Sequence, residues 1–171
     1  MDDPLGTLAE VLAEARIEYA LIGGHAVNAW LEPRFTADID VTMTAGAAQL
    51  DRLTAGLAKR GFTIAAQYGE EQPSGPDLVR FESKDPRLIL EFQSAKTGLQ
   101  DDVIRRAHRD TRGLRVATPE DLIVPKLIAN RPNDRIDLIG LCALPDLDWA
   151  YIEACATEWE VGERLEEFRS E

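Results

Sequence analysis

The sequence predicts an α/β (α+β) protein in which helices flank a mixed β-sheet and a short C-terminal helical extension follows. Two observations support this fold class. Short apolar runs typical of strands alternate with segments whose apolar residues recur at helical spacing, and glycine and proline residues separate the two kinds of segment. We expect residues 1–117 to form the core and residues 118–171 to pack on it as a helical extension, giving one compact domain.

Composition limits the possible functions. The chain has 171 residues, 44% of them hydrophobic, which is enough for one buried core. Thirty-one acidic residues against 19 basic ones give a net charge of −12, which argues against non-specific binding to nucleic acid or to an anionic membrane. The acidic N-terminus and the lack of any run of about 18 apolar residues predict a cytoplasmic protein with no membrane contact.

The cysteine and histidine residues do not suggest a metal or redox centre. Cys142 and Cys155 lie far apart in apolar helical stretches, so we expect buried or idle thiols. His25 and His108 are too few for a zinc site built on histidine and cysteine.

The first elements lead to a glycine turn. Apolar residues at helical spacing predict an opening amphipathic helix: Leu5, Leu8, Leu12 and Ala15. Residues 19–22 form a short apolar strand that ends at Gly23-Gly24, where glycine allows a tight turn and a close approach to a ligand. A short helix beginning there would direct free N–H groups at that turn, which favours phosphate.

Two carboxylates occupy the next predicted strand, residues 38–41. Asp38 and Asp40 point to one face, whereas Ile39 and Val41 point to the core. Alternate Cα atoms on a strand lie about 6.6 Å apart, so both carboxylates could bind one small cation. An Asp-x-Asp pair alone can equally cap a turn, but beside a phosphate-binding turn it indicates nucleotide chemistry.

The glycines followed by Asp38-Ile39-Asp40 resemble the signature of the polymerase-β-like nucleotidyltransferases. The nearest branch is the group of small bacterial enzymes related to abortive-infection toxins and lincosamide nucleotidyltransferases. The resemblance covers residues 21–144, although only the glycine and aspartate motif is specific. It implies a nucleotidyltransferase-like fold, a nucleoside triphosphate (NTP) donor, two Mg²⁺ ions, and a role in phage defence or beside a cognate antitoxin.

Further strands and a helix follow the aspartate pair. We expect a helix over residues 46–60 that Gly61 stops, then a strand over residues 62–66. Glycine, proline and charged residues mark residues 68–77 as an exposed loop, either a flap over the site or an inert connection, and we favour the second. Residues 78–82 and 87–93 predict a hairpin joined at residues 83–86.

Glu91 is a candidate third carboxylate. It ends an apolar strand, where an unpaired carboxylate is costly to bury without a partner or a cation. The resemblance implies a third metal ligand at this point of the chain, commonly Asp, for which Glu91 is the best match and Glu82 the weaker one. The alternative is a solvent-facing Glu on an edge strand.

Five arginines lie close together in this acidic chain: Arg105, Arg106, Arg109, Arg112 and Arg115. They form either a docking surface for an acceptor such as RNA or a solvated face with ion pairs to nearby acids, and we favour ion pairs. A last short strand is expected over residues 114–117.

Thr118 and Pro119 predict the start of a helix that runs to Asn130. The resemblance implies that Lys126 meets the triphosphate; the alternative is a lysine that reaches water at the edge of the helix. Pro125 should kink this helix. We expect Asp134 and Asp137 to cap or to pair with arginines rather than to bind metal.

The tail, residues 148–168, predicts one or two closing helices whose aromatic residues belong to the core.

The mechanism implied by the resemblance is an attack of an acceptor hydroxyl on the α-phosphorus of the NTP. Asp38, Asp40 and Glu91 would bind Mg²⁺, and Glu91 could take the hydroxyl proton. Gly23, Gly24 and Lys126 would bind the β- and γ-phosphates. Arg34 and Thr36 are candidate nucleotide or acceptor contacts by position only, and His25 is expected to be structural.

The acceptor, whether RNA, a small molecule or a protein, is open. Two other functions also remain open: a non-catalytic module that binds a nucleotide or a partner, and a metal-dependent phosphohydrolase. Retention of all three candidate carboxylates argues against the inactive module.

Overall fold

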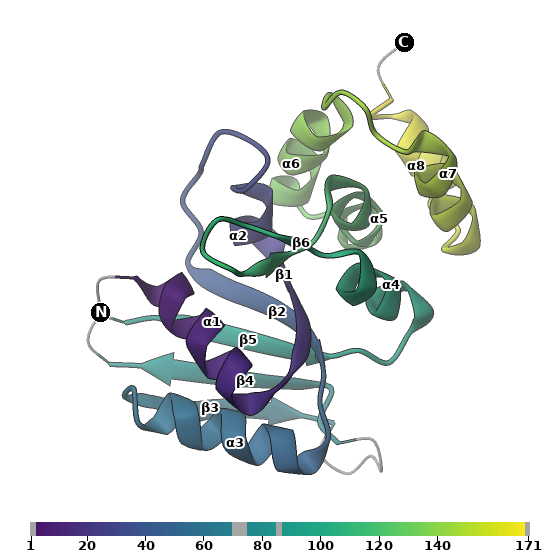
Figure 1. The fold of residues 1–171 in the computed structure, drawn as a ribbon. Helices are drawn as coiled ribbons and strands as arrows, with labels where there is room; N and C mark the ends of the chain where they lie inside the picture. The colour runs from purple at the N-terminus through teal and green to yellow at the C-terminus, as the bar shows by residue number, and fades with distance from the viewer. Residues whose placement is uncertain (1–2, 70–74, 85–86, 170–171) are drawn as a thin grey trace.

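The computed structural model describes residues 3–69, 75–84 and 87–169, and its sheet has seven strands flanked by helices (Figure 1). The strands are β1 (Glu18–Ile22), β2 (Asp38–Thr44), β3 (Phe62–Tyr68), β4 (Leu78–Ser83), β5 (Ile89–Ser94), β6 (His108–Arg109) and β7 (Arg115–Val116). The helices are α1 (Pro4–Ala15), α2 (Gly23–Val27), α3 (Ala47–Ala58), α4 (Gly98–Arg106), α5 (Pro119–Ala129), α6 (Pro132–Cys142), α7 (Trp149–Glu158) and α8 (Gly162–Glu166). The expected fold class is confirmed.

The sheet is mixed, with strand order β3-β4-β5-β2-β1-β7-β6. β2 pairs antiparallel with β1 and parallel with β5, and β1 pairs parallel with β7. β4 and β5 form the expected antiparallel hairpin. β5 is therefore an inner strand, so the edge-strand alternative for Glu91 is wrong.

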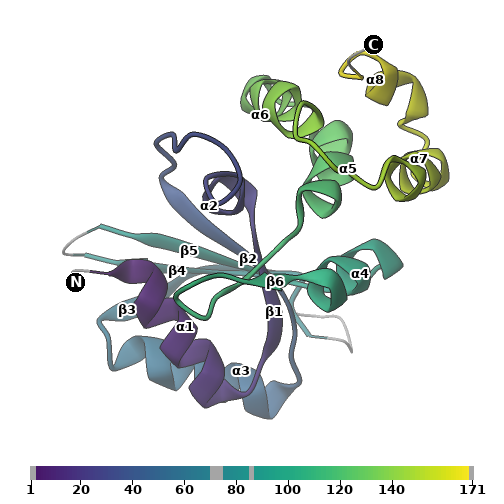
Figure 2. The ribbon, with the colours of Figure 1, turned by 45° about the horizontal axis from the view of Figure 1, so that its top comes forward.

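The two faces of β2 and β5 differ in polarity. Ile39 and Val41 are 3% and 0% exposed and belong to the core, as the sequence predicts. α1 and α3 cover one face of the sheet, whereas α5, α6 and α7 lie beyond the other (Figures 1 and 2). The polar residues of β2 and β5 therefore face the side on which the C-terminal helices lie.

Several expected elements are present, and two were missed. The helix α3 ends shortly before Gly61, which has a φ of +85° that favours glycine. β6 and α4 were not predicted, although Thr97 and Gln100 form a capping box at the start of α4. Of the expected loop and hairpin turn, residues 70–74 and 85–86 lie outside the described residues.

The helix α5 begins as predicted, with the side chain of Thr118 accepting a hydrogen bond from the Asp121 N–H at 3.3 Å. It continues as one helix through Pro125 to Ala129, although proline cannot donate a backbone hydrogen bond to the preceding turn. Asn130 ends it in the left-handed conformation.

The closing helices α7 and α8 contribute to the core, as expected for the tail. Ile152, Leu165 and Phe168 are buried, and Trp159 packs against the core. Cys142 and Cys155 are free thiols, also as expected. Within the described residues, no helix combines the length and the apolar character needed to cross a membrane.

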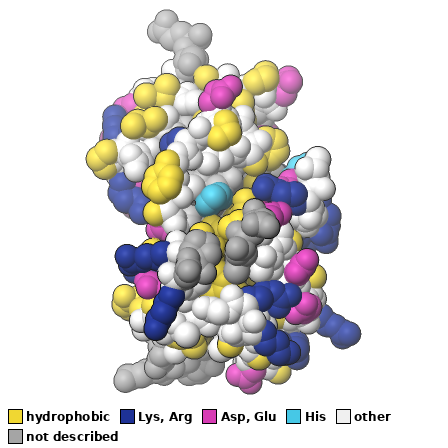
Figure 3. Space-filling model, turned by 90° about the vertical axis from the view of Figure 1, so that its left-hand side faces the viewer, with side chains coloured by type: hydrophobic (Ala, Val, Ile, Leu, Met, Phe, Trp, Pro, Cys, Tyr) yellow, Lys and Arg dark blue, Asp and Glu magenta, His cyan; other side chains and the backbone are white. Residues whose placement is uncertain are grey.

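The surface outside the sheet is mixed in charge. Figure 3 shows one face on which Lys and Arg side chains are interspersed with Asp and Glu. Hydrophobic side chains gather over its upper part. Large exposed hydrophobic residues of the molecule include Phe35, Ile136 and Ile139, of which Phe35 is 90% exposed.

Candidate active site

Three carboxylates meet on the polar face of the sheet. The parallel register of β2 and β5 pairs Asp40 with Glu91 directly, and Asp38 lies two residues before Asp40 on the same face. Carboxylate oxygens of Asp38, Asp40 and Glu91 all lie within 4.8 Å of one another. The sheet thus brings together the three carboxylates that the sequence singled out.

The electrostatics of this carboxylate cluster favour a cation. Burial first, then the charges of Asp38 and Glu91, raise the pKa of Asp40 from 3.8 to about 6. Three partly buried carboxylates this close together repel one another, and oxygen ligands of this kind are those that Mg²⁺ prefers. The donor set therefore fits a divalent metal ion.

Arg80 already compensates one of these charges. β4 pairs with β5 so that Arg80 lies opposite Glu91, and the Arg80 Nε donates to Glu91 Oε1 at 2.8 Å. The Arg80 guanidinium makes a second contact with the same oxygen through a terminal nitrogen. The other oxygen of Glu91 has no hydrogen-bond partner among the described residues. Arg80 was not predicted as a site residue, although the register of the predicted hairpin places it opposite Glu91.

The glycine turn lies directly against the carboxylates. Gly23 has a φ of +64°, and a Cβ on it would lie 2.0 Å from Asp40 Oδ2. A Cβ on Gly24 would lie 2.6 Å from Thr36 Oγ1. The two glycines therefore let the start of α2 approach β2 and the segment before it. Gly23 lines the pocket described below.

Lys126 is buried in a network of ions between α5 and α6. Its Nζ donates to Asp137 Oδ2 at 2.7 Å and to Asp134 Oδ1 at 3.2 Å. Asp134 also accepts from Arg131, and Asp137 from Arg34. The prediction that these aspartates pair with arginines is confirmed, whereas the lysine at their centre was not foreseen as their partner.

The ion network around Lys126 lowers the pKa values of its two aspartates. Burial alone would raise the pKa of Asp134 and Asp137, but hydrogen bonds from Arg131 and Arg34, joined by Lys126, lower both. The side chain of Lys126 is only 8% exposed. The alternative in which it reaches water at the edge of the helix is therefore wrong. The positive charges of Lys126 and Arg131 also lower the pKa of Asp40, but burial and the neighbouring carboxylates raise it by more.

Arg34 holds the segment that enters β2. Arg34 binds Asp137 through two nitrogens, Nε at 2.8 Å and Nη2 at 2.7 Å. The Asn28 side chain also fixes this segment, because it donates to the Arg34 carbonyl and accepts from the Arg34 N–H. Neither Arg34 nor Thr36 is among the described residues that line the pocket.

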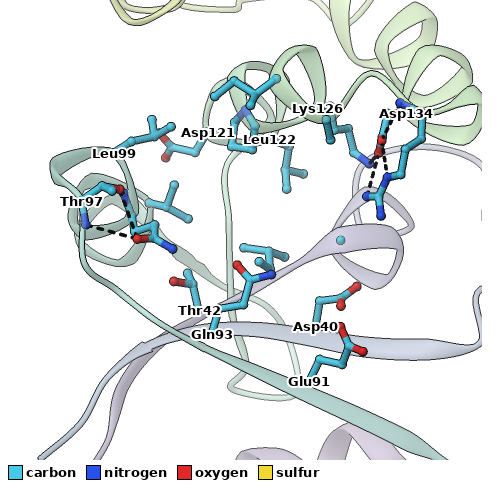
Figure 4. Close-up of a pocket in the computed structure, with 18 of the residues that line it drawn as sticks. Asp40, Thr42, Glu91, Gln93, Thr97, Leu99, Asp121, Leu122, Lys126 and Asp134 are labelled. Carbon is cyan, nitrogen blue, oxygen red and sulfur yellow. Dashed lines mark hydrogen bonds and ion pairs between the residues drawn. The ribbon is translucent and has the colours of Figure 1, made fainter. Parts of the chain in front are cut away.

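A cavity of about 460 Å³ lies over the carboxylates. Asp38, Asp40 and Glu91 are on the floor contributed by β2 and β5, while α4, α5 and α6 supply the opposite wall (Figure 4). Lys126 and Asp134 lie at the carboxylate end, and Thr97 and Leu99 lie at the other end. The pocket is thus formed jointly by the sheet and the C-terminal helices.

The arginine cluster is largely neutralised, which agrees with the favoured interpretation. Arg105 pairs with Asp102, Arg106 with Asp121 and Glu120, Arg112 with Asp110, and Arg115 with Glu18. Arg109 donates instead to the Gly113 carbonyl.

Two solved structures have a fold similar to that of this chain. An antigenic nucleotidyltransferase-like protein from Paracoccidioides brasiliensis matches with a TM-score of 0.59 at 18% identity, covering 95% of this chain and 88% of that one. The antibiotic-resistance factor ANT(2'')-Ia matches with a TM-score of 0.53 at 18% identity, covering 94% and 86%. No curated protein matches the chain. These two structural matches show that the chain has a nucleotidyltransferase-like fold.

The family follows from the sequence itself. Residues 7–137 match the model described as "Nucleotidyl transferase AbiEii toxin, Type IV TA system". The chain therefore belongs to the AbiEii family of nucleotidyltransferase toxins of type IV toxin–antitoxin systems. The matched region includes the glycine turn, all three carboxylates and Lys126 with both of its aspartate partners.

Proposed function

We propose that this protein transfers a nucleoside monophosphate from an NTP to an acceptor hydroxyl in a Mg²⁺-dependent reaction. The observation that carries the proposal is the carboxylate cluster of Asp38, Asp40 and Glu91 beside the Gly23 turn. In the proposed reaction the acceptor oxygen bonds to the α-phosphorus, the bond between the α-phosphorus and its bridging oxygen breaks, and pyrophosphate leaves with the electron pair.

The chain's own residues divide this work. Asp38, Asp40 and Glu91 would hold Mg²⁺, which supplies charge neutralisation of the phosphates and acidifies the attacking hydroxyl. The free oxygen of Glu91 is a candidate acceptor for the hydroxyl proton. Gly23 and Gly24 offer backbone N–H groups, and Lys126 offers a positive charge, to the β- and γ-phosphates.

Lys126 would meet the phosphates while it stays paired with Asp134 and Asp137, so it would not act as an isolated cation. Its ammonium group is held at 2.7 Å and 3.2 Å by two carboxylates, which fixes its position but offsets its charge. Arg131 lies in the same network and also lines the pocket, so it adds positive charge at this end. Arg34 and Thr36 are proposed to act by holding the segment that leads to Asp38.

We further propose that the core over residues 1–117 and the extension over residues 118–171 work as one unit. Lys126 and Asp134 of the extension line the same pocket as Asp38 and Asp40. A cognate antitoxin is the expected partner, in keeping with the family.

The test is transfer of label from each α-labelled NTP, with Mg²⁺, into the RNA, protein and small-molecule fractions of a cell lysate. Asp40→Asn is compared with Asp51→Asn, which makes the same change at an exposed position of α3. We expect one fraction to gain label with wild type and Asp51→Asn and to lose it with Asp40→Asn.

Other results would point to the alternatives. Nucleotide binding without transfer to any fraction would favour a binding module. Release of nucleoside monophosphate or diphosphate without labelled acceptor would favour a phosphohydrolase.

A further inference from the structure

The floor of the pocket carries a second pair of polar residues beyond the carboxylates. In the parallel register of β2 and β5, Asp40 lies opposite Glu91 and Thr42 lies opposite Gln93. Because side chains two residues apart share a face, the second pair lies about 6.6 Å further along the strands than the first. Figure 4 shows Thr42 and Gln93 on the same side of the sheet as Asp40 and Glu91.

Thr42 and Gln93 have unused hydrogen-bonding groups. Thr42 is 2% exposed, and its Oγ1 has no hydrogen-bond partner among the described residues. The Gln93 carboxamide makes no side-chain hydrogen bond within the described part of the chain either. Buried polar groups are nearly always paired in folded proteins, so an unpaired hydroxyl beside a pocket indicates a partner that binds from the pocket.

Two other polar side chains at this end of the pocket, Gln100 and Asp121, already accept hydrogen bonds. Gln100 Oε1 accepts from the N–H groups of Lys96 and Thr97 in the capping interaction at α4. Asp121 accepts from Arg106 and from the hydroxyls of Thr118 and Tyr151. The free polar groups that face the pocket here are therefore uncharged.

The opposite wall is apolar over this pair. Leu99, Leu122 and Pro125 line the cavity from α4 and α5. An apolar wall facing an amide and a hydroxyl suits a flat heterocycle with donors and acceptors on its edge, and it does not suit a phosphate. A Gln carboxamide offers a donor and an acceptor side by side, the arrangement that reads the edge of a base.

We propose that Thr42 and Gln93 bind the nucleobase of the donor NTP and determine which NTP the protein uses. The inference rests on the proposed function, since it assumes that the triphosphate lies at the carboxylates. The base then lies between the β2–β5 floor and the apolar side chains of α4 and α5. Gln93 reads its edge, and the Thr42 hydroxyl completes the hydrogen bonding.

The experiment measures binding of ATP, GTP, CTP, UTP and inorganic triphosphate, each with Mg²⁺, by titration calorimetry. Wild type is compared with Gln93→Leu, Thr42→Val and the control Gln67→Leu, which makes the same change at an exposed position of β3. We expect wild type to prefer one base by roughly tenfold or more, which is the discrimination that a bidentate contact provides. Gln93→Leu should lose most of that preference and Thr42→Val part of it, whereas Gln67→Leu should keep it.

Inorganic triphosphate separates this proposal from the proposed function. It has no base, so its affinity should be the same in all four proteins. If it binds but wild type shows no base preference, or if Gln93→Leu keeps the preference of wild type, the base site is overturned while the phosphate site stands. If neither inorganic triphosphate nor any NTP binds, the proposed function fails and the base site with it. Urea unfolding of each variant checks that the fold is intact.

Discussion

Gly23 and Asp40 lie so close that a single methyl group would not fit between them. A Cβ built on Gly23 would lie 2.0 Å from Asp40 Oδ2, and the φ of +64° at this position disfavours any residue with a Cβ. The glycine that opens α2 therefore sets the position of a carboxylate on β2. The glycine turn and the Asp38-Ile39-Asp40 motif therefore depend on each other for their positions.

Gly23→Ala should displace Asp40 and destabilise the fold by about 1 to 3 kcal/mol. Transferase activity should fall with it, because Asp40 would move away from Asp38 and Glu91. Gly61→Ala is the matched control, since Gly61 also has a positive φ, +85°, but nothing lies within 4 Å of its added Cβ. Urea unfolding and the labelled-transfer assay provide the measurements. Equal stability of the two variants would contradict the contact.

Asp40→Asn should stabilise the metal-free protein at neutral pH. The folded pKa of Asp40 is raised to about 6, so the folded protein keeps a proton that the unfolded chain has lost above about pH 4. Stability therefore falls as the pH rises from 4 to 6. The gain from Asp40→Asn should reach about 1 to 3 kcal/mol at pH 7.5 and nearly vanish below pH 4. Urea unfolding in EDTA at the two pH values tests this, and a gain that does not depend on pH would refute it.

Mg²⁺ should raise the thermal midpoint of wild type at pH 7.5 and raise it less at pH 5. A ligand that binds only the folded state stabilises it in proportion to the logarithm of its concentration over Kd. Protons compete with the metal for Asp40, which explains the weaker effect at the lower pH. Asp40→Asn should reduce the shift, whereas Asp51→Asn should not. A shift of the same size in both variants would place the bound metal elsewhere.

Lys126→Met should destabilise the protein by about 3 kcal/mol at pH 7, because two buried carboxylates lose a shared partner. The folded pKa values of Asp134 and Asp137 are lowered, so their favourable contribution exists above the ordinary Asp pKa and is lost as the pH falls through the lowered values. The difference between wild type and variant should therefore shrink below about pH 4. Urea unfolding across this range measures it, with Lys59→Met, at an exposed position, as the control.

Much of the fold was predictable from local patterns. Gly61, Thr118 and the alternation around Ile39 and Val41 carry signals within a few residues, and these elements are confirmed. Thr97 and Gln100 carried the same kind of signal for α4, so that omission was avoidable. β6 has two residues and depends on pairing with β7, which no local pattern shows.

The candidate site likewise contains residues that local sequence indicates and residues that only the tertiary structure brings together. Asp38 and Asp40 were visible because they share one strand. Glu91 was found through the family resemblance, and only the sheet register shows that it meets Asp40. Lys126 lies between Asp134 and Asp137 because two helices pack together, a contact that sequence spacing alone does not fix. Roles in catalysis for these residues stay predictions.

The pairing of Arg34 with Asp137 also bears on protein synthesis. The two residues are separated by 103 positions, and Lys126 comes from the same late stretch of the chain. Chains begin to fold while they leave the ribosome, starting with their N-terminal part. A nascent chain can therefore carry all three carboxylates and still lack the partner that anchors the segment before β2. The pocket is completed only after α6 has emerged, so incomplete translation products would not carry it.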